Sequence, residues 1–493
     1  MKNMKTGAWA LPIGVALSSG ALAADLPSKT KGPAIEYVRI CDAYGKGFFV
    51  IPGTDTCLKI SGYVRADYAV RSTHNVLAKK VGGLVLTTNA GLVPPVNFPA
   101  VNSVNGLDSS GFRARGRVEF DARSKTEFGD LRGFVRYQID QGDGVFGTSV
   151  AGIAGAPDAT LDLGYVQWAG ITAGRAKTFF FAYGEGPDVP FDTSRSYNFK
   201  SQLLAYTFKA GGFSATASLE DPVARRGTLF AINPTALPGR PKAASIPAFV
   251  YGGSKTPDLV ANLRYEGDWG LASLSGAYHE INTLGGATAA DLAVIGAPHA
   301  RASGWAVNGV VQFKLPMLAA NDELFFQAAY ANGAKCYLSL CGGTSLGSTT
   351  PFNLARNDAD AVAVRLNPAA GDFSYRIEKS RGYSLQAGLT HYWTPTLFQR
   401  FWASYTSLDY GTATKNIDWT KGGLGRGRDL IVATNLHWLP VKDLDIAAEV
   451  SYSRLSQSLA HDPSLPPTIL PAALGIKENS DTFTGRLRLQ RNF

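Results

Sequence analysis

The feature that most constrains the fold is a run of charged side chains at every second position of one segment. In Gly111–Ser124 a polar set of residues alternates with an apolar set. The polar set is Arg113, Arg115, Arg117, Glu119, Asp121 and Arg123, and the apolar set is Phe112, Ala114, Gly116, Val118, Phe120 and Ala122. Because the side chains of a β-strand point alternately to two faces, this period predicts a strand with six charges on one face. Such a face requires water, whereas the opposite face requires an apolar neighbour.

The same two-residue period recurs along most of the chain, and helical periodicity is nearly absent. Clear examples are Cys57–Val70, Asp130–Asp140, Trp305–Phe313, Asp443–Ser453 and Asp481–Phe493. Each of these segments sets small or apolar residues against polar or charged ones. The sequence therefore predicts an all-β protein, and the alternating segments add up to about sixteen strands.

The connections between these segments alternate between short and long. The short ones are Ser124–Gly129, Ala210–Gly212, Gly267–Gly270, Leu315–Asn321, Thr394–Thr396 and Leu439–Asp443. The long ones are Arg71–Asp108, Gln141–Ala159, Phe181–Ser201, Asp221–Thr256, Asn282–Ala300, Gly333–Ser380, Gly411–Gly427 and Gln457–Lys477. The long segments are rich in Gly, Pro, Ala, Asn and Ser, so we expect them to be loops. This order is typical of up-and-down hairpins whose long loops all lie at one end.

Together these features favour a transmembrane antiparallel up-and-down β-barrel over residues 57–493. A strand in lipid must satisfy its backbone groups with neighbouring strands, so the sheet has to close on itself. One face then meets hydrocarbon and the other meets a wet lumen, which fits a mean hydropathy of −0.03. A secreted β-sandwich or β-helix would also alternate, but the polar face of a sandwich is usually Ser, Thr and Lys rather than a row of charges.

The first residues predict export. Residues 1–23 contain Lys2 and Lys5, then an uncharged stretch, then an A-x-A site, which is the pattern of a cleaved signal peptide. A transmembrane anchor is the alternative, but the stretch is short for a span of about 20 residues and contains Pro12. Removal of the two lysines lowers the formal charge from +9 to +7. The basic balance then favours anionic solutes or a membrane surface, because export and the lack of a motif argue against nucleic acid.

Four cysteines suit an oxidising compartment. Cys41 and Cys57 flank one turn-rich segment, and Cys336 and Cys341 lie close together in another. Sequential pairing is the simplest, although four cysteines allow three connectivities. Metal binding is disfavoured because the spacing is not Cys-x-x-Cys and no histidine lies near. We expect residues 24–56 to be a periplasmic-side segment with a small disulfide-closed hairpin.

Three stretches carry a resemblance to a known family. They are AADLPSKTKGPAIEYVRICDAYGKGFFVIPGTDTCLKISGYVRADY near the N-terminus, AGITAGRAKTFFFAY in the middle, and the final strand, which ends on Phe493. With them the mature chain resembles, over nearly its whole length, the trimeric general porins of alphaproteobacterial outer membranes. The resemblance implies a barrel of about sixteen strands, a homotrimer and passive diffusion of small hydrophilic solutes. It also implies that Phe493 helps the barrel-assembly machinery to recognise the chain.

A barrel of this width needs a constriction to select solutes, and the resemblance implies that its third long loop, Phe181–Ser201, folds into the lumen. The acidic residues of that loop are Glu185, Asp188 and Asp192. The resemblance sets arginines on the opposite wall, and the candidates are Arg65, Arg113, Arg115, Arg117, Arg132, Arg136 and Arg175. Acids facing arginines would create a transverse field across a water-filled slot, which favours hydrated, dipolar solutes.

Each arginine has an alternative interpretation as one half of a salt bridge on the lumen wall. The carboxylates for such pairs are Glu119, Asp121 and Asp140. Arginine stays charged because its pKa lies above about 12, so a cluster of arginines is tolerated only beside water, counter-ions or acids. Either interpretation predicts a wet interior.

We therefore expect a non-specific, passive outer-membrane porin. An anion- or solute-selective channel of the same fold is the second hypothesis, because the strand arginines outnumber nearby acids. A barrel enzyme or surface adhesin is the third, but the six histidines are scattered and neither HExxH nor a Ser-His-Asp arrangement can be argued. We expect no cofactor and no metal, and as partners outer-membrane lipid and lipopolysaccharide.

Overall fold

The computed structural model describes the chain from residue 39 onward, with gaps in the long connections. The described residues are 39–74, 109–146, 157–181, 199–226, 228–232, 250–284, 299–338, 359–365, 375–412, 425–458 and 479–493. The predicted signal peptide lies outside them, as do Cys341 and the acidic residues Glu185, Asp188 and Asp192.

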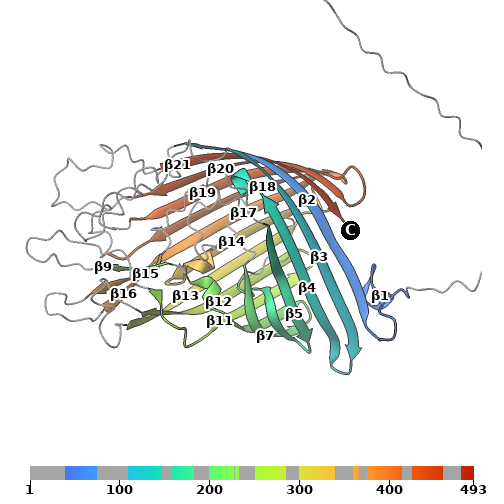
Figure 1. The fold of residues 1–493 in the computed structure, drawn as a ribbon, viewed down its shortest axis with the longest axis horizontal. Helices are drawn as coiled ribbons and strands as arrows, with labels where there is room; N and C mark the ends of the chain where they lie inside the picture. Colours follow the sequence, from blue (N-terminus) through green and yellow to red (C-terminus); the bar gives the residue numbers. More distant parts are fainter. Residues whose placement is uncertain are drawn as a thin grey trace, which may run out of the picture.

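Sixteen antiparallel strands form one closed barrel (Figure 1). They are β2 (Cys57–His74), β3 (Ser110–Thr126), β4 (Gly129–Gly142), β5 (Asp158–Trp168), β6 (Ile171–Lys177), β7 (Lys200–Ala210), β8 (Phe213–Glu220), β11 (Asp258–Gly267), β12 (Gly270–Leu284), β13 (His299–Lys314), β14 (Glu323–Asn332), β17 (Arg381–Thr394), β18 (Leu397–Asp409), β19 (Gly427–Trp438), β20 (Leu444–Gln457) and β21 (Asn479–Asn492). Each strand pairs with the barrel strands before and after it, and β21 pairs with β2 from Asn492 opposite Tyr63 to Asp481 opposite His74. The predicted up-and-down barrel is confirmed.

Alternation decides which way each side chain points. On β3, Phe112 and Phe120 are 68% and 41% exposed on the outside of the barrel, while the arginines between them turn inward and are half-buried. On β21, Leu487 is exposed on the outside, whereas Arg486 and Arg488 are buried on the inside. An apolar outer face over a polar inner face is the arrangement that hydrocarbon on one side and water on the other require.

Tryptophans mark the rim where the short turns lie. Those on the outer surface beside short turns are Trp168, Trp269, Trp393 and Trp438, and each is exposed. Amphipathic aromatic rings favour the headgroup level of a bilayer, where one edge meets lipid and the other meets water. This rim therefore lies at a membrane interface.

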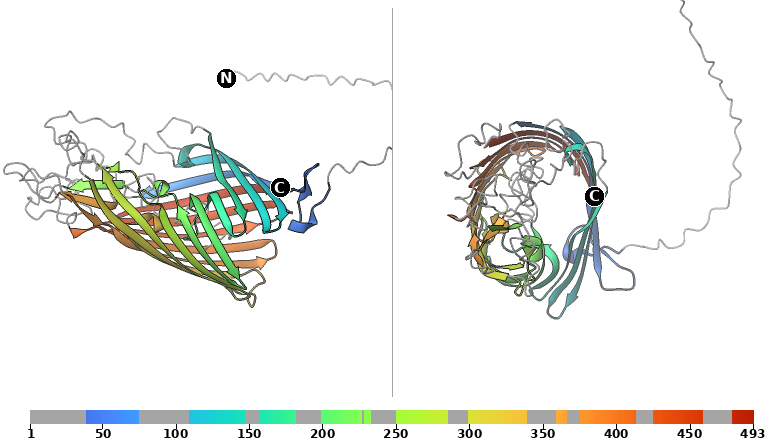
Figure 2. Two further views of the ribbon diagram at one scale, coloured as in Figure 1. Left: turned by 90° about the horizontal axis from the view of Figure 1, so that it is seen from below. Right: turned by 60° about the vertical axis from the view of Figure 1, so that its left-hand side comes forward.

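The predicted short connections all join neighbouring strands. The described residues contain one more short connection, which the sequence pattern did not predict. Ala169 and Gly170 link β5 to β6, with φ angles of 49° and 85°. Positive φ at both positions is what a two-residue type I′ hairpin requires. The strand ends that flank the long connections lie at the opposite end of the barrel (Figure 2).

The long connections contain strands as well as loops, so the expectation that they are loops only is wrong. The additional strands are β9 (Thr228–Ile232), β10 (Val250–Tyr251), β15 (Ala359–Arg365) and β16 (Tyr375–Lys379). Strand β15 pairs in parallel with β9 and antiparallel with β16, which gives a small second sheet at the long-loop end (Figure 1). These strands are too short to show a period, and β15 finds its partner β9 far away in sequence. Val362 and Val364 on β15 are buried, so packing stabilises the sheet.

The N-terminal segment lies at the short-turn end, where β1 (Phe49–Val50) pairs with the start of β2. A disulfide joins Cys41 to Cys57 and closes this hairpin, which confirms the sequential pairing for these two cysteines. Cys336 is also disulfide-bonded. The disulfide ties the segment to a strand that both β3 and β21 hold in place.

The named helices of the described residues are short 3-10 turns. They are η1 (Asp42–Tyr44), η4 (Gly144–Phe146), η6 (Val223–Arg225) and η7 (Lys335–Leu338). In the part of the chain that the structure describes, no helix is long and apolar enough to cross a membrane. Three of the turns, η4, η6 and η7, bring side chains next to the inward faces of barrel strands.

Two adjacent residues on β20 test which face meets lipid. Val450 is 62% exposed on the outside, and its neighbour Ser451 points inward. Val450→Arg should lower the free energy of unfolding by about 2–4 kcal/mol, the cost of an arginine on the lipid face near the bilayer midplane. Ser451→Arg is the matched control and should cost far less, because its side chain reaches the lumen. Urea titration in lipid vesicles, followed by tryptophan fluorescence, measures both; equal losses would contradict the assigned faces.

Candidate functional site

The arginines of β3 lie on the inward face of the barrel, beside the inward side chains of the neighbouring strand β2. Arg113 lies opposite Asp67, Arg115 opposite Arg65, and Arg117 opposite Tyr63 in the strand register. The guanidinium groups of Arg65 and Arg117 lie over the Tyr63 ring, at 4.5 and 4.8 Å from its centre. Stacking on the ring holds like charges on neighbouring strands in fixed positions.

Asp67 is the best-buried carboxylate of this wall, with 3% of its surface exposed. Its Oδ2 accepts hydrogen bonds from Nε and Nη2 of Arg113 at 3.0 and 2.7 Å. Its Oδ1 accepts one from Nε of Arg488 on β21 at 2.7 Å. One carboxylate therefore joins strands β2, β3 and β21 at the place where the barrel closes.

The next two arginines of β3 turn toward β4. Arg115 forms an ion pair with Asp140, which lies directly opposite it. Arg117 donates to Oε1 of Gln138 at 2.7 Å, and its Nη2 lies 3.8 Å from Oδ2 of Asp162. The arginines of β3 thus stand side by side on the lumen wall, each oriented by a different partner.

The remaining predicted arginines of β2 and β4 join the same wall. Arg132 donates to both oxygens of Asp121 at 2.9 Å, and Arg136 forms an ion pair with Glu119 at 2.7 Å. Arg65 donates to Gln490 at 2.7 Å. Ion pairs to Glu119, Asp121 and Asp140 are therefore present on the wall, as the alternative interpretation of these arginines expected.

Several basic residues of this wall were not among the predicted site residues. They are Arg71 on β2, Arg123 on β3, and Arg486 and Arg488 on β21. Arg113 and Arg486 both lie over the ring of Phe146 in η4, at 4.7 and 5.3 Å. The signal was available in the sequence, because an up-and-down barrel must pair its first strand with its last and so adds the last strand's arginines to the wall.

Arg175 does not join this wall. In the register it lies opposite Gly164 on β5 and Gln202 on β7, on the face that also carries the exposed Val166. Its Nε donates to the carbonyls of Leu161 and Asp162. The structure places its side chain on the outward face of β6, away from the other arginines.

The predicted constriction loop enters the lumen at its described ends. Phe180 follows β6 and is fully buried, and its carbonyl accepts a hydrogen bond of 3.1 Å from Nδ2 of Asn308. Asn308 is an inward-facing residue in the middle of β13, well around the barrel from β6. The chain therefore leaves the wall after β6 and lies inside the barrel at Phe180.

The wall around Asn308 carries mainly hydroxyl and amide groups instead of arginines. Its buried inward-facing residues include Asn262, Ser273, Ser275, Asn308, Gln327, Ser384, Gln386, Ser404 and Asn435. On β2, β3, β4 and β21, by contrast, the inward arginines clearly outnumber Asp67, Glu119, Asp121 and Asp140. The lumen is therefore electrostatically one-sided, with its positive potential along one wall. Within the described residues no cluster of three His, Cys, Asp or Glu could hold a metal.

The burial of Asp67 gives a measurable consequence for stability. Asp67→Asn leaves Arg113 and Arg488 without their shared carboxylate and should lower the free energy of unfolding by about 3 kcal/mol, as for a broken buried pair. Asp140→Asn is the control: the Asp140 side chain is 19% exposed, so its loss should cost about 1 kcal/mol or less. Urea unfolding of both variants measures the difference; equal costs would show that Asp67 is not the closing contact.

Comparison with known proteins agrees with this architecture. The chain matches the Porin subfamily over residues 25–473. It is 29% identical over 275 residues to porin Omp2b of Brucella suis, which covers 54% of this chain and 63% of that one, and 28% identical to Omp2b of Brucella abortus (strain 2308) over 54% and 62%. The matched part thus spans under two thirds of these relatives. The outer membrane channel DcaP of Acinetobacter baumannii has the same fold, with a TM-score of 0.51 at 14% identity over 90% of this chain and 99% of that one. The chain belongs to the porin family of outer-membrane β-barrels.

Proposed function

We propose that the protein is a channel through which small hydrophilic solutes and ions diffuse passively across the outer membrane. The observation that carries the proposal is the closed barrel, in which four neighbouring strands, β21, β2, β3 and β4, place arginines on the inward face. A barrel of about sixteen strands leaves an aqueous channel, and these charges require one. Membership of the porin family supports the same function.

The proposed selectivity device is a transverse field between two sides of the lumen. Arg113, Arg115 and Arg117 form the positive side, with Arg65, Arg132 and Arg136 beside them. The negative side would be the acids of the inward-folded loop, Glu185, Asp188 and Asp192. Both described ends of that loop lie inside the barrel, which supports this arrangement. Hydrated, dipolar solutes align in such a field, while apolar solutes would have to displace water that the field orders.

A preference for anions is the second candidate, and the excess of inward arginines over carboxylates favours it. Arg71 and Arg486 strengthen the case, because they lie on the inward face of neighbouring strands, with Arg71 opposite Thr484 and Arg486 opposite Ala69. Positive charge along one wall raises the local concentration of anions and lowers that of cations. The preference should weaken at high salt, since screening shortens the reach of the wall.

We further propose that the working unit is a homotrimer that carries no catalytic activity. The apolar outer face of β2, β3 and β4, with Val64, Phe112 and Val135 exposed, could be covered by lipid or by a second copy. The polar groups of the arginine wall are held in ion pairs instead of being aimed as a nucleophile and a base. We also propose that residues 1–23 are a cleaved signal peptide and that Phe493, whose backbone pairs with Gly62, is read by the assembly machinery.

Neutralising the arginine face tests the proposed function. The triple variant Arg113→Gln, Arg115→Gln, Arg117→Gln should shift the reversal potential in a salt gradient toward cations, because it removes three positive charges from the channel wall. Arg175→Gln, which removes a charge from the outward face, should leave the reversal potential unchanged. Planar bilayers with purified protein provide the measurement. Unchanged selectivity in a folded triple variant would show that these side chains do not line the ion path.

A further inference from the structure

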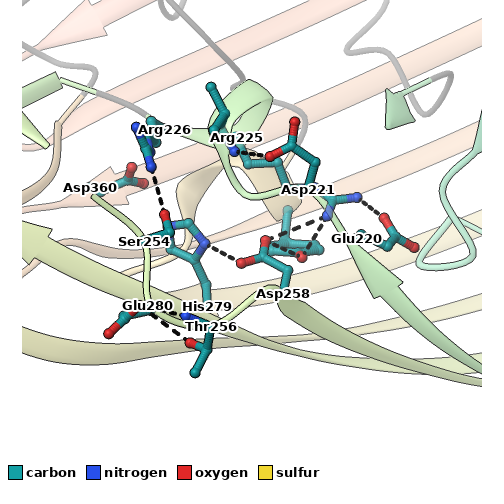
Figure 3. A network of polar contacts seen from close by, with 12 residues as sticks. Glu220, Asp221, Arg225, Arg226, Ser254, Thr256, Asp258, His279, Glu280 and Asp360 are labelled. Atoms are coloured by element: carbon teal, nitrogen blue, oxygen red, sulfur yellow. Dashed lines mark hydrogen bonds and ion pairs between the residues drawn. The ribbon is translucent and has the colours of Figure 1, made fainter. Parts of the chain in front are cut away.

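A row of ionisable side chains crosses three adjacent strands on the wall that faces the arginines. Glu220 ends β8, Asp258 begins β11, and His279 lies on β12; all three point inward and are buried. Asp258 is the register partner of Glu220, and its Oδ1 lies 2.8 Å from Nδ1 of His279 (Figure 3). Carboxylates directly opposite each other on neighbouring strands repel, so this row requires a cation.

Arg225 supplies that cation from η6, in a long connection. Its guanidinium pairs with Glu220 and lies 3.5 Å from Oδ2 of Asp258 (Figure 3). Its Nη1 donates to the hydroxyl of Tyr337 at 2.9 Å. The Tyr337 hydroxyl in turn donates to Oδ2 of Asp258 at 2.7 Å. Arg225 is only 2% exposed, so every one of these contacts is made away from bulk water.

The same guanidinium holds both ends of the inward-folded loop. Its Nη2 donates to Oγ1 of Thr178, just after β6, at 2.8 Å. The guanidinium also lies over the ring of Phe199, just before β7, at 4.7 Å from its centre. Glu220 adds a third contact to the loop ends, because its Oε1 accepts a hydrogen bond of 3.2 Å from the backbone N–H of Phe179. Arg225 and Glu220 therefore fix the positions at which the loop leaves and rejoins the barrel.

An apolar group packs against this contact inside the barrel. We call it the lumenal cluster: Phe179, Phe180, Phe181, Phe199, Tyr337, Leu338, Val362, Val364, Leu408, Tyr410 and Leu455, which lie against inward-facing alanines of β12, β13 and β14. The ring of Phe180 lies 4.6 Å from that of Tyr337. These side chains occupy space that would otherwise be open lumen. The cluster contains no residue of β2, β3 or β4, so it does not cover the arginines of those strands.

The charge of Arg225 is permanent in this setting. Burial works to lower the pKa of Arg225, but its contacts with Tyr337, Glu220 and Asp258 outweigh burial and raise it above the usual value. Burial raises the pKa of Tyr337 well above its usual value, so its hydroxyl keeps the proton that it donates to Asp258. Arg225 and Tyr337 therefore both keep the protons that they donate in this contact.

We propose that Arg225 is a positioning residue for permeation: it fixes the lumenal cluster against β8, β11 and β12 and thereby sets the free cross-section of the channel. The inference rests on the proposed diffusion function. Without Arg225, Glu220 and Asp258 would repel each other, and Thr178 and Phe199 would lose their common contact. The cluster would then move away from the wall in some of the molecules, and larger solutes would pass.

Conductance and size exclusion test the proposal. Arg225→Met keeps the length and apolar stem of the side chain but removes its charge. It should give noisier open-channel currents in planar bilayers and a several-fold faster swelling of vesicles in disaccharide solution. Arg225→Lys should restore part of the wild-type behaviour, since one ammonium can pair with Glu220 but cannot make the bidentate set. A purely structural role would change folding yield without this graded change in solute size.

Arg226→Met is the matched control, because it removes the same charge one residue later, where Arg226 donates to Ser254 at 2.6 Å. Its exclusion size and current noise should match wild type. If Arg225→Met does not fold, the isosteric Glu220→Gln decides, and it should also raise noise and disaccharide flux. Folded variants with wild-type size exclusion and noise would overturn the proposed role of Arg225. A wild-type protein that conducts no ions would instead overturn the proposed function.

Discussion

Backbone hydrogen bonding in lipid is the constraint on which the rest of this structure depends. Hydrocarbon offers no partner for a free N–H or C=O, so the sheet must close, and it does so where β21 pairs with β2. Closure gives every strand an outside and an inside, which enforces the two-residue period. It also brings Arg488 beside Asp67 and Arg113, three residues from distant parts of the chain. The charged wall is thus a consequence of closing the barrel as much as of the sequence of β3.

The two halves of the interior differ in which polar groups they carry and in what those groups contact. On β2, β3, β4 and β21 the arginines need water and carboxylates, and Asp67, Asp121 and Glu119 orient them without neutralising them all. On the opposite side, hydroxyl and amide groups meet inward-folded segments that bury Phe180 and Tyr337. A buried ion pair is costly unless it is fully hydrogen-bonded, and the contacts of Arg225 meet that condition. Under the proposed function, water and ions pass between the packed side and the charged side.

The sequence could predict the barrel and the arginine face of β3 because their period is unbroken and local. It could not place Arg175, since the alternate positions of β6 hold Gly174 and Ala176, residues too small to mark a face. The sequence also could not predict the sheet of β9, β15 and β16 or the role of Arg225. Both depend on contacts between separate connections, and Arg225 meets Tyr337 from 112 residues away. Alternation reports the environment of a residue on its own strand, whereas these contacts depend on which loops meet inside the barrel.

The structure requires that one face of β3 meets water and that the other does not. Single cysteines at each position from Phe112 to Val118, in barrels reconstituted in lipid vesicles, test it through reaction with membrane-impermeant thiol reagents. We expect fast reaction for Arg113→Cys, Arg115→Cys and Arg117→Cys and slow reaction for Phe112→Cys, Ala114→Cys, Gly116→Cys and Val118→Cys. Anionic reagents should react faster than cationic ones at the reactive positions. Reaction without a two-residue period, or with the opposite phase, would show that the arginine face of β3 does not line a water-filled lumen.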